Sequence, residues 1–299
     1  MTALRNESYR PYRIFLLQKK HWKKWTTHSK IIEIHISFKE YEVVEVLNLR
    51  FKWVIVINGW YALLTVPRAN YMIKHKERYS DQQRFEFACR MMDHMRRCSH
   101  TATRVYGKEN IPEEDGVIFF SNHQGKYDAL GILLALKKPC GVLWEKKQAN
   151  RLMSKQVCGL LEGVDIDLTD MRDKVRSIRK VTDAVQGGKD FLIFPEGGYT
   201  DNHNELQEFQ TGCFSCSLRS KGPVVPVVIY DSYKAMNSNT FEKVITQVHF
   251  LKAILYEEYG NLTKQQLADL VKSRIAEKLE EIKSGLCTGL QPDQVIGKA

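Results

Sequence analysis

Three short runs of apolar residues constrain the fold most strongly, and they cover Val117–Phe120, Phe191–Phe194 and Val224–Ile229. A strand that is apolar at every position has to be buried on both faces, as happens in parallel sheets that are covered by helices. Segments with the 3.6-residue periodicity of helices separate these runs, among them residues 129–136, 171–185 and 211–219. The sequence therefore predicts an α/β fold with a largely parallel central sheet that helices cover on both faces.

Further strands and helices are expected around these runs. Strands are predicted at residues 103–105, 116–120, 140–144, 164–168, 191–194, 224–229 and 246–251. Ser80 and Gln83 form a capping-box signature before a helix that ends near Arg97, and Thr263 starts an amphipathic helix that reaches Ile282. Helical patterns are also predicted from about residue 146 to residue 161.

A histidine and an aspartate stand where the first apolar run gives way to a helix. His123 and Asp128 are five positions apart, which on a regular helix is a turn of about 140°. Their side chains can therefore meet only if His123 lies on the loop before the helix and Asp128 near its first turn. Asp128 could then accept a hydrogen bond from one imidazole nitrogen and leave the other free to take a proton. On the spacing alone the favoured interpretation is a packed or capping histidine and an aspartate stabilised by the helix dipole, and the rest of the chain has to decide between the two.

The charge composition limits the classes of molecule that the protein is expected to bind. The 299 residues carry a formal net charge of +10, from 45 Lys and Arg against 35 Asp and Glu. Such a surface suits nucleic acid, anionic lipid headgroups or a nucleotide-bearing acyl carrier. No helix-turn-helix, zinc-finger or RNA-binding signature accompanies the charge, so a nucleic-acid partner is disfavoured. The seven scattered cysteines are typical of reduced, intracellular thiols, and no ligand cluster suggests a metal.

The first 70 residues are predicted to form a basic N-terminal segment, and residues 71–299 the main domain. Lys19–Trp25 interleaves lysines with tryptophans, which fits either a membrane-surface patch or a solvated tail. Trp53–Val66 is the most apolar stretch, and as a helix ended by Pro67 it would be about 21 Å long, short of the roughly 30 Å hydrocarbon core. A helix dipping into one leaflet is expected, with a buried core helix as the alternative.

Two further motifs follow the His123 motif in the chain and help to interpret it. Phe194-Pro195-Glu196-Gly197 follows the second apolar run, and Val225-Pro226-Val227 lies in the third. Together with Asn122–Asp128, in this order, they resemble the glycerolipid acyltransferase family that includes lysophosphatidic acid acyltransferases. The signatures of that family are N-H-x-x-x-x-D and F-P-E-G, and the resemblance covers about residues 71–282.

The resemblance implies transfer of a fatty acyl group from acyl-CoA or acyl-carrier protein to the free hydroxyl of 1-acylglycerol 3-phosphate, giving phosphatidic acid. His123 would be the general base and Asp128 its orienter, with no cofactor besides the acyl donor and no metal. The backbone N–H groups around Gly125 would receive the oxyanion. The enzyme would sit on the cytoplasmic face of a membrane as a peripheral or monotopic protein. Substrate binding would fall to Asn122, Lys126, Glu196, Gly197, Gly198 and Arg172.

Two positions depart from the family pattern. Tyr199 and Leu168 stand where the family usually has arginines that are thought to hold the acceptor's phosphate. Lys126 and Arg172 are the candidate replacements, because a buried phosphate needs matching cations. The departures keep other acceptors open, such as glycerol 3-phosphate or another lysophospholipid. A lipid-binding pseudoenzyme is disfavoured because both His123 and Asp128 are present.

Overall fold

The computed structural model describes residues 49–286 and 290–297, so the predictions for Lys19–Trp25 and for the rest of residues 1–48 lie outside it. The strands are β1 Thr101–Tyr106, β2 Ile118–Ser121, β3 Cys140–Glu145, β4 Val164–Ile166, β5 Asp190–Ile193, β6 Val224–Tyr230, β7 Val244–Phe250 and β8 Gln294–Ile296. The helices are α1 Leu49–Lys74, α2 Asp81–Cys98, α3 Asp128–Leu136, α4 Lys146–Ala149, α5 Ser154–Leu160, α6 Met171–Gln186, α7 Ser215–Ser220, α8 Tyr233–Met236, α9 Tyr256–Tyr259 and α10 Lys264–Lys283.

The strands form one eight-stranded sheet in the order β4-β3-β5-β2-β6-β7-β1-β8. Neighbouring strands are parallel except for the pairs β6–β7 and β1–β8. Phe119 of β2 is in register with Leu192 of β5 and Val225 of β6. The carboxyl ends of these three central strands therefore meet at one edge of the sheet, which is where sites in such folds are built.

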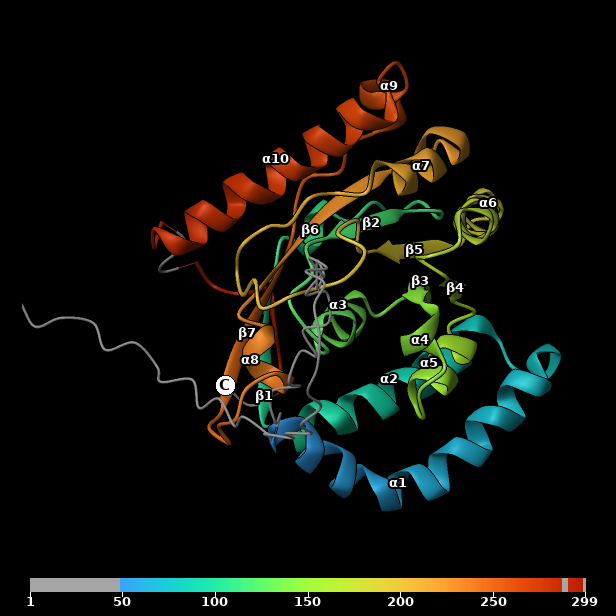
Figure 1. The fold of residues 1–299 in the computed structure, drawn as a ribbon, viewed down its shortest axis with the longest axis vertical. Coiled ribbons are helices and arrows are strands. Elements are labelled where there is room, and N and C mark those ends of the chain that lie inside the picture. Colours follow the sequence, from blue (N-terminus) through green and yellow to red (C-terminus); the bar gives the residue numbers. More distant parts are fainter. Residues whose placement is uncertain (1–48, 287–289, 298–299) are drawn as a thin grey trace, which may run out of the picture. The chain divides into compact units, whose positions relative to one another are not determined.

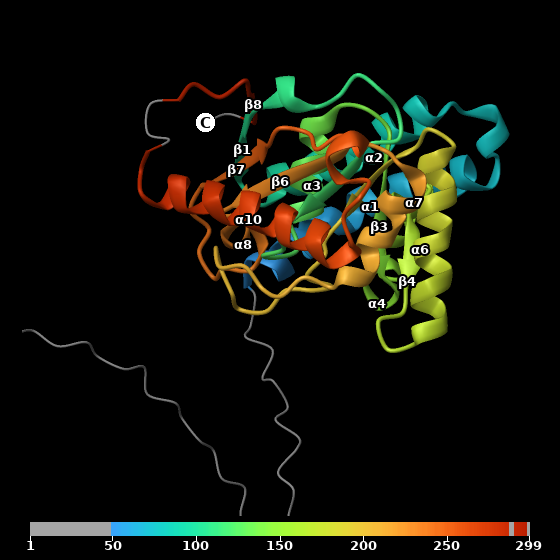
Figure 2. The ribbon, with the colours of Figure 1, turned by 90° about the horizontal axis from the view of Figure 1, so that it is seen from above.

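Helices cover both faces of this sheet, as predicted (Figure 1). In β2, the side chain of Phe119 packs with α1, α2, α3 and α5, while Ile118 and Phe120 pack with α6, α7 and α10. Figure 2 shows α10 lying across the strands on the second of these faces. Successive side chains of a strand point to opposite faces of the sheet, and here both faces are buried. This explains why these strands are apolar at every position.

One predicted boundary is wrong and one strand was not predicted. The helical patterns expected over residues 146–161 are two short helices, α4 and α5, and between them Met153 takes a left-handed φ of 67° that a continuous helix does not allow. The helix around Trp53–Val66 does not end at Pro67 but runs on to Lys74. The carbonyl that Pro67 leaves without a helical partner belongs to Leu63, which is on the exposed side. Strand β8, which pairs with β1, was missed.

Helix α1 is 26 residues long, or about 39 Å, and it packs against α2 and α5. Its buried side is partly polar and includes Asn58 and Thr65, whereas its outer side exposes large apolar residues, namely Trp53, Ile55, Val56, Trp60, Leu63 and Leu64. The core-helix alternative thus holds for one side of α1 only. Within the described residues, none of the helices has the length and apolar character needed to cross a membrane.

A buried arginine fastens the start of α1 to the rest of the domain. Arg50 is 1% exposed, and its guanidinium donates to the carbonyl oxygens of Ser99 at 2.5 Å, Glu242 at 2.7 Å and Lys234 at 3.4 Å. These carbonyls belong to the end of α2, the chain before β7 and helix α8. The predicted division between residues 70 and 71 falls inside α1, and the separate role of residues 1–70 stays a prediction.

Candidate active site

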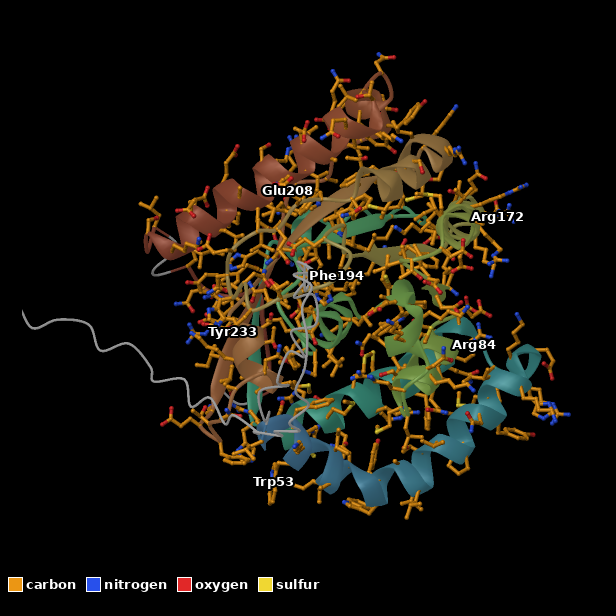
Figure 3. The ribbon with its side chains drawn as sticks, in the orientation of Figure 1. Trp53, Arg84, Arg172, Phe194, Glu208 and Tyr233 are labelled. Atoms are coloured by element: carbon orange, nitrogen blue, oxygen red, sulfur yellow. The ribbon has the colours of Figure 1, made fainter. Side chains whose placement is uncertain are left out.

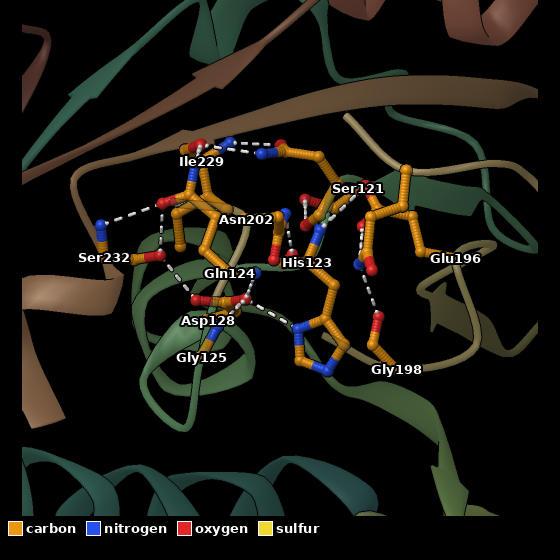
Figure 4. Close-up of polar contacts among 12 residues, drawn as sticks. Ser121, His123, Gln124, Gly125, Asp128, Glu196, Gly198, Asn202, Ile229 and Ser232 are labelled. Atoms are coloured by element: carbon orange, nitrogen blue, oxygen red, sulfur yellow. Dashed lines mark hydrogen bonds and ion pairs between the residues drawn. The ribbon is translucent and has the colours of Figure 1, made fainter. Parts of the chain in front are cut away.

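His123 and Asp128 are in contact at the carboxyl end of β2 (Figure 4). His123 lies on the loop after the strand, and Asp128 is the first residue of α3. The distance between His123 Nδ1 and Asp128 Oδ2 is 2.6 Å, and the carboxylate is wholly buried while the imidazole is 19% exposed. The other ring nitrogen, Nε2, points away from Asp128. This geometry leaves one imidazole nitrogen outside the contact with Asp128, on a ring that is partly exposed.

The Asp128 carboxylate collects donors from several sides. Its Oδ2 accepts the backbone N–H groups of Gln124 at 2.5 Å and Gly125 at 2.9 Å, besides the His123 ring. Its Oδ1 accepts the hydroxyl of Ser232 at 2.5 Å. A carboxylate at the first turn of a helix captures nearby N–H groups readily. The expectation that N–H groups around Gly125 receive an oxyanion is therefore wrong for these two donors.

Two aromatic rings hold the imidazole from either side. Phe194 stacks on the His123 ring with centroids 4.3 Å apart, and Tyr199 meets it edge-on at 4.7 Å. Burial raises the pKa of the Tyr199 phenol to about 12, so the phenol stays protonated and neutral near neutral pH. Both rings come from the segment after β5, where Phe194 begins the F-P-E-G turn and Tyr199 follows it. The imidazole is thus oriented by packing as well as by Asp128.

Glu196 lies directly behind the His123 loop. Its carboxylate accepts the backbone N–H of His123 at 3.3 Å and the side-chain amide of Gln207 at 2.6 Å. Gln207 also donates to the carbonyl of Gly198, and Gly197 adopts a left-handed φ of 76° that lets the chain turn sharply after β5. Burial raises the pKa of the Glu196 carboxyl above its ordinary value. Glu196, Gly197 and Gly198 are therefore joined to the His123 loop.

The side chain of Asn122 is hydrogen-bonded to the backbone of β6 at the carboxyl edge of the sheet. It is 1% exposed, its Nδ2 donates to the Ile229 carbonyl at 2.9 Å, and its Oδ1 accepts the Ile229 N–H at 2.8 Å. The amide thus pairs with the backbone of β6 as a neighbouring strand would. Both polar atoms of the amide are thus engaged by β6, and the assignment of Asn122 to substrate binding stays a prediction.

The two candidate cations are placed differently. Lys126 lies beside the pair, with its Nζ 4.9 Å from the ring centre of Phe51 and 5.9 Å from that of Tyr199. Arg172 is exposed in the first turn of α6, and Figure 3 shows it pointing outward, away from Phe194. The structure brings Lys126 next to His123 and leaves Arg172 outside that cluster.

Several polar side chains of the site escaped the sequence analysis. Asn202 donates to the carbonyl of His123 at 3.2 Å, and Asn204 joins Gln124 to Asp231. With Gln207 and Ser232 they tie the segment after β5 and the end of β6 to the His123 loop. The density of Asn and Gln between residues 202 and 210 was the signal available, because amides gather where several loops must be joined.

Comparisons with known proteins agree with this geometry. Residues 102–230 match the model of the Acyltransferase family, and they span β1 to β6 with the whole His123–Asp128 cluster. The fold resembles the crystal structure of the 1-acyl-sn-glycerophosphate (LPA) acyltransferase PlsC from Thermotoga maritima, with a TM-score of 0.63 at 18% sequence identity over 79% of this chain and 94% of that one. Residues 102–230 thus match the acyltransferase family, and the protein is an O-acyltransferase.

Within the family, the similarity is to enzymes of one kind. The chain is 24% identical over 198 residues to human 1-acyl-sn-glycerol-3-phosphate acyltransferase alpha, covering 65% of this chain and 69% of that protein. It is 24% identical over 177 residues to the 1-acyl-sn-glycerol-3-phosphate acyltransferase of Salmonella typhimurium, covering 58% and 72%. These relatives are lysophosphatidic acid acyltransferases, so the similarity is to that group of glycerolipid acyltransferases.

Proposed function

We propose that the protein moves a fatty acyl group from acyl-CoA or acyl-carrier protein to the free hydroxyl of 1-acylglycerol 3-phosphate, giving phosphatidic acid. The observation that carries the proposal is the 2.6 Å contact between His123 Nδ1 and the buried Asp128, which leaves Nε2 directed away from the carboxylate on a partly exposed ring. The names of the similar human and Salmonella typhimurium enzymes support this acceptor. The product belongs to phospholipid biosynthesis.

His123 acts as the general base in this reaction. Its Nε2 takes the proton of the acceptor hydroxyl while the hydroxyl oxygen attacks the thioester carbonyl, and the tetrahedral intermediate then expels the thiolate. The new C–O ester bond replaces the C–S bond, and the imidazolium returns the proton to the departing sulfur. Asp128 keeps the proton on Nδ1 and stabilises the imidazolium. A thioester is already activated, so these steps need no protein nucleophile and no cofactor.

The acceptor's glycerol end is placed at the Glu196-Gly197-Gly198 turn. This turn is tied to the His123 loop by the bond from the His123 N–H to Glu196. A lysolipid bound there would have its hydroxyl within reach of the imidazole, since both groups stand at the same sheet edge. In this arrangement the carboxylate of Glu196 positions the loop, and the glycine backbone lets the acceptor approach closely.

Lys126 is the cation we assign to the acceptor's phosphate. Tyr199 occupies the place of the usual arginine, and the Lys126 ammonium lies over its ring. Lys126→Ala is expected to raise the KM for the acceptor about tenfold with little change in kcat. The matched control is Lys221→Ala, because Lys221 also lies over an aromatic ring, that of Tyr256, at 5.3 Å. Equal effects of the two substitutions would remove Lys126 from the phosphate site. Glycerol 3-phosphate and other lysophospholipids are the alternative acceptors.

We further propose that the outer side of α1 rests in one leaflet of a membrane. The exposed tryptophans and leucines of that side would lie among headgroups and acyl chains, as in interfacial helices. The net charge of +10 suits an anionic surface, such as the cytoplasmic face of a membrane. The protein would then meet its lipid acceptor as a peripheral or monotopic enzyme.

A thiol-release assay with acyl-CoA and a panel of acceptors tests the proposal. Wild-type protein is expected to release thiol with 1-acylglycerol 3-phosphate, and His123→Ala to lose about 10²–10⁴-fold in kcat, the usual contribution of a general base. His203→Ala is the matched control, because His203 forms an exposed pair with Asp201 at 3.0 Å. Full turnover by folded His123→Ala protein would refute the mechanism.

A further inference from the structure

We propose that Ser232 is a positioning residue of the acyltransferase reaction, which acts by holding the Asp128 carboxylate in the plane that the His123 ring requires. This inference rests on the proposed function, because it extends the His123–Asp128 pair to a third side chain. Ser232 lies at the end of the segment after β6, more than a hundred residues from Asp128 in the sequence, and Figure 4 shows it on the side of Asp128 opposite His123.

The first observation is the division of donors over the two carboxylate oxygens. Asp128 Oδ2 accepts the His123 ring and two backbone N–H groups. Among the residues that the structure describes, the one hydrogen bond to Oδ1 comes from the Ser232 hydroxyl, at 2.5 Å. Both oxygens turn together about the Cβ–Cγ bond of Asp128. A donor on Oδ1 therefore resists the same rotation that would carry Oδ2 away from His123.

The second observation is that Ser232 occupies a helix N-cap position without capping the helix. A serine in front of a helix normally accepts a backbone N–H from the first turn. Here the Ser232 side chain makes no such bond to α8 and turns toward Asp128 instead. A residue that gives up its local partner for a distant one is typical of a functional site.

The third observation concerns how firmly Ser232 is placed. Its side chain is fully buried, and its backbone N–H donates to Gln124 Oε1 at 3.1 Å. Gln124 is itself held by Ile229 and Asn204. The hydroxyl lies 2.9 Å from Gln124 Oε1 as well, but it has one proton, and the shorter contact to a charged acceptor is the stronger one. Ser232 is therefore aimed at Asp128 by a rigid frame.

Loss of this hydroxyl should change the chemistry in a recognisable way. Ser232→Ala is expected to lower kcat about 10- to 100-fold, the size of a lost hydrogen bond to a charged group, while KM for acyl-CoA stays within about twofold. The acid limb of the kcat/KM profile is expected to move to higher pH, because the carboxylate that has lost a donor attracts the imidazolium proton more strongly. Ser232→Thr, which keeps the hydroxyl, is expected to recover most of the rate.

Ser177→Ala is the matched control. Ser177 is also a buried serine, and its hydroxyl donates to the Asp165 carbonyl at 2.8 Å, away from His123. It is expected to match wild type in kcat and in pH profile, with thermal unfolding and circular dichroism showing that both variants fold. Ser232→Ala with a wild-type rate and pH profile would overturn the inference.

Double substitution separates this inference from the proposed function. If Ser232 acts through Asp128, Ser232→Ala in an Asp128→Asn background is expected to reduce kcat by less than about twofold further. A full second reduction would show that Ser232 acts elsewhere and overturn the inference alone. An active His123→Ala variant would instead refute the proposed function, and the Ser232 inference would fall with it.

Discussion

Replacing Asp128 with asparagine changes the charge beside His123 and little else. An asparagine has the same shape, and its oxygen can still accept the N–H groups of Gln124 and Gly125, while its amide group can face the Ser232 hydroxyl, which rotates to accept. The fold should therefore survive. What the substitution removes is the negative charge that stabilises the imidazolium formed when His123 takes the proton.

The magnitude follows from the geometry of the pair. With 2.6 Å between Nδ1 and Oδ2, the centres of the two delocalised charges are about 4 Å apart. At an effective dielectric of about 20, such a pair attracts by about 4 kcal/mol. Loss of that term from the transition state corresponds to a fall in kcat of about a thousandfold. The hydrogen bonds that remain limit the loss of folding stability to about 2 kcal/mol.

The assay is thiol release at saturating acyl-CoA and acceptor, combined with chemical unfolding of each variant. Asp190→Asn is the matched control, because Asp190 is a buried aspartate that accepts the Val117 N–H at 2.8 Å and pairs with Lys138 at 2.6 Å, at the amino end of β5. It should lose stability and keep kcat. The charge argument is refuted if folded Asp128→Asn protein loses less than tenfold in kcat, or if Asp190→Asn loses as much.

Three further predictions concern other parts of the molecule. The free energy of unfolding of wild type is expected to fall relative to that of Glu196→Gln as the pH rises from 4.5. Burial raises the pKa of the Glu196 carboxyl, so its ionised form destabilises the folded state. Urea titrations of both proteins at several pH values measure this difference, and a difference that stays constant would contradict the prediction. Arg50→Met should cost about 3 kcal/mol and lower Tm by roughly 6–12 °C in calorimetry, because buried carbonyls lose their donor, whereas Arg274→Met, which frees one surface carbonyl, should change Tm by less than about 2 °C. Val56→Ser with Leu63→Ser should weaken binding to anionic vesicles at least about tenfold in a sedimentation assay, while Leu286→Ser, equally exposed elsewhere, should not; equal effects would argue against α1 as the contact.

The sheet was predictable because the apolar runs are local patterns in the chain, whereas the contact of His123 with Asp128 was expected only once the F-P-E-G and V-P-V motifs were taken together with it. A run such as Phe119–Phe120 is stable only in a strand that is buried on both faces. A histidine on the loop before a helix can contact only side chains in the first turn of that helix. The partners supplied by distant segments were not predictable. Ser232, Asn204 and Gln207 meet the His123 loop only after the sheet has formed, and no periodicity announces them.

Boundaries failed where the prediction relied on one residue. Pro67 reads as the end of a helix, but the carbonyl it orphans is on an exposed turn, where other partners are available. The break between α4 and α5 lies at Met153, which has a left-handed φ. Methionine rarely takes this conformation, so the position of the break could not be predicted from the residue type. The engagement of Asn122 by β6 likewise needed the register of the sheet.

The buried guanidinium of Arg50 links the start of α1 to helix α8. It donates to the carbonyl of Lys234 in α8, the helix that Ser232 precedes, so we expect α1 and the His123 site to keep a fixed separation. If α1 rests in the lipid as proposed, the imidazole stays at one height above the leaflet and cannot move down toward a buried alcohol. The lysolipid would have to rise to meet it, and chains that slide outward easily would then react fastest.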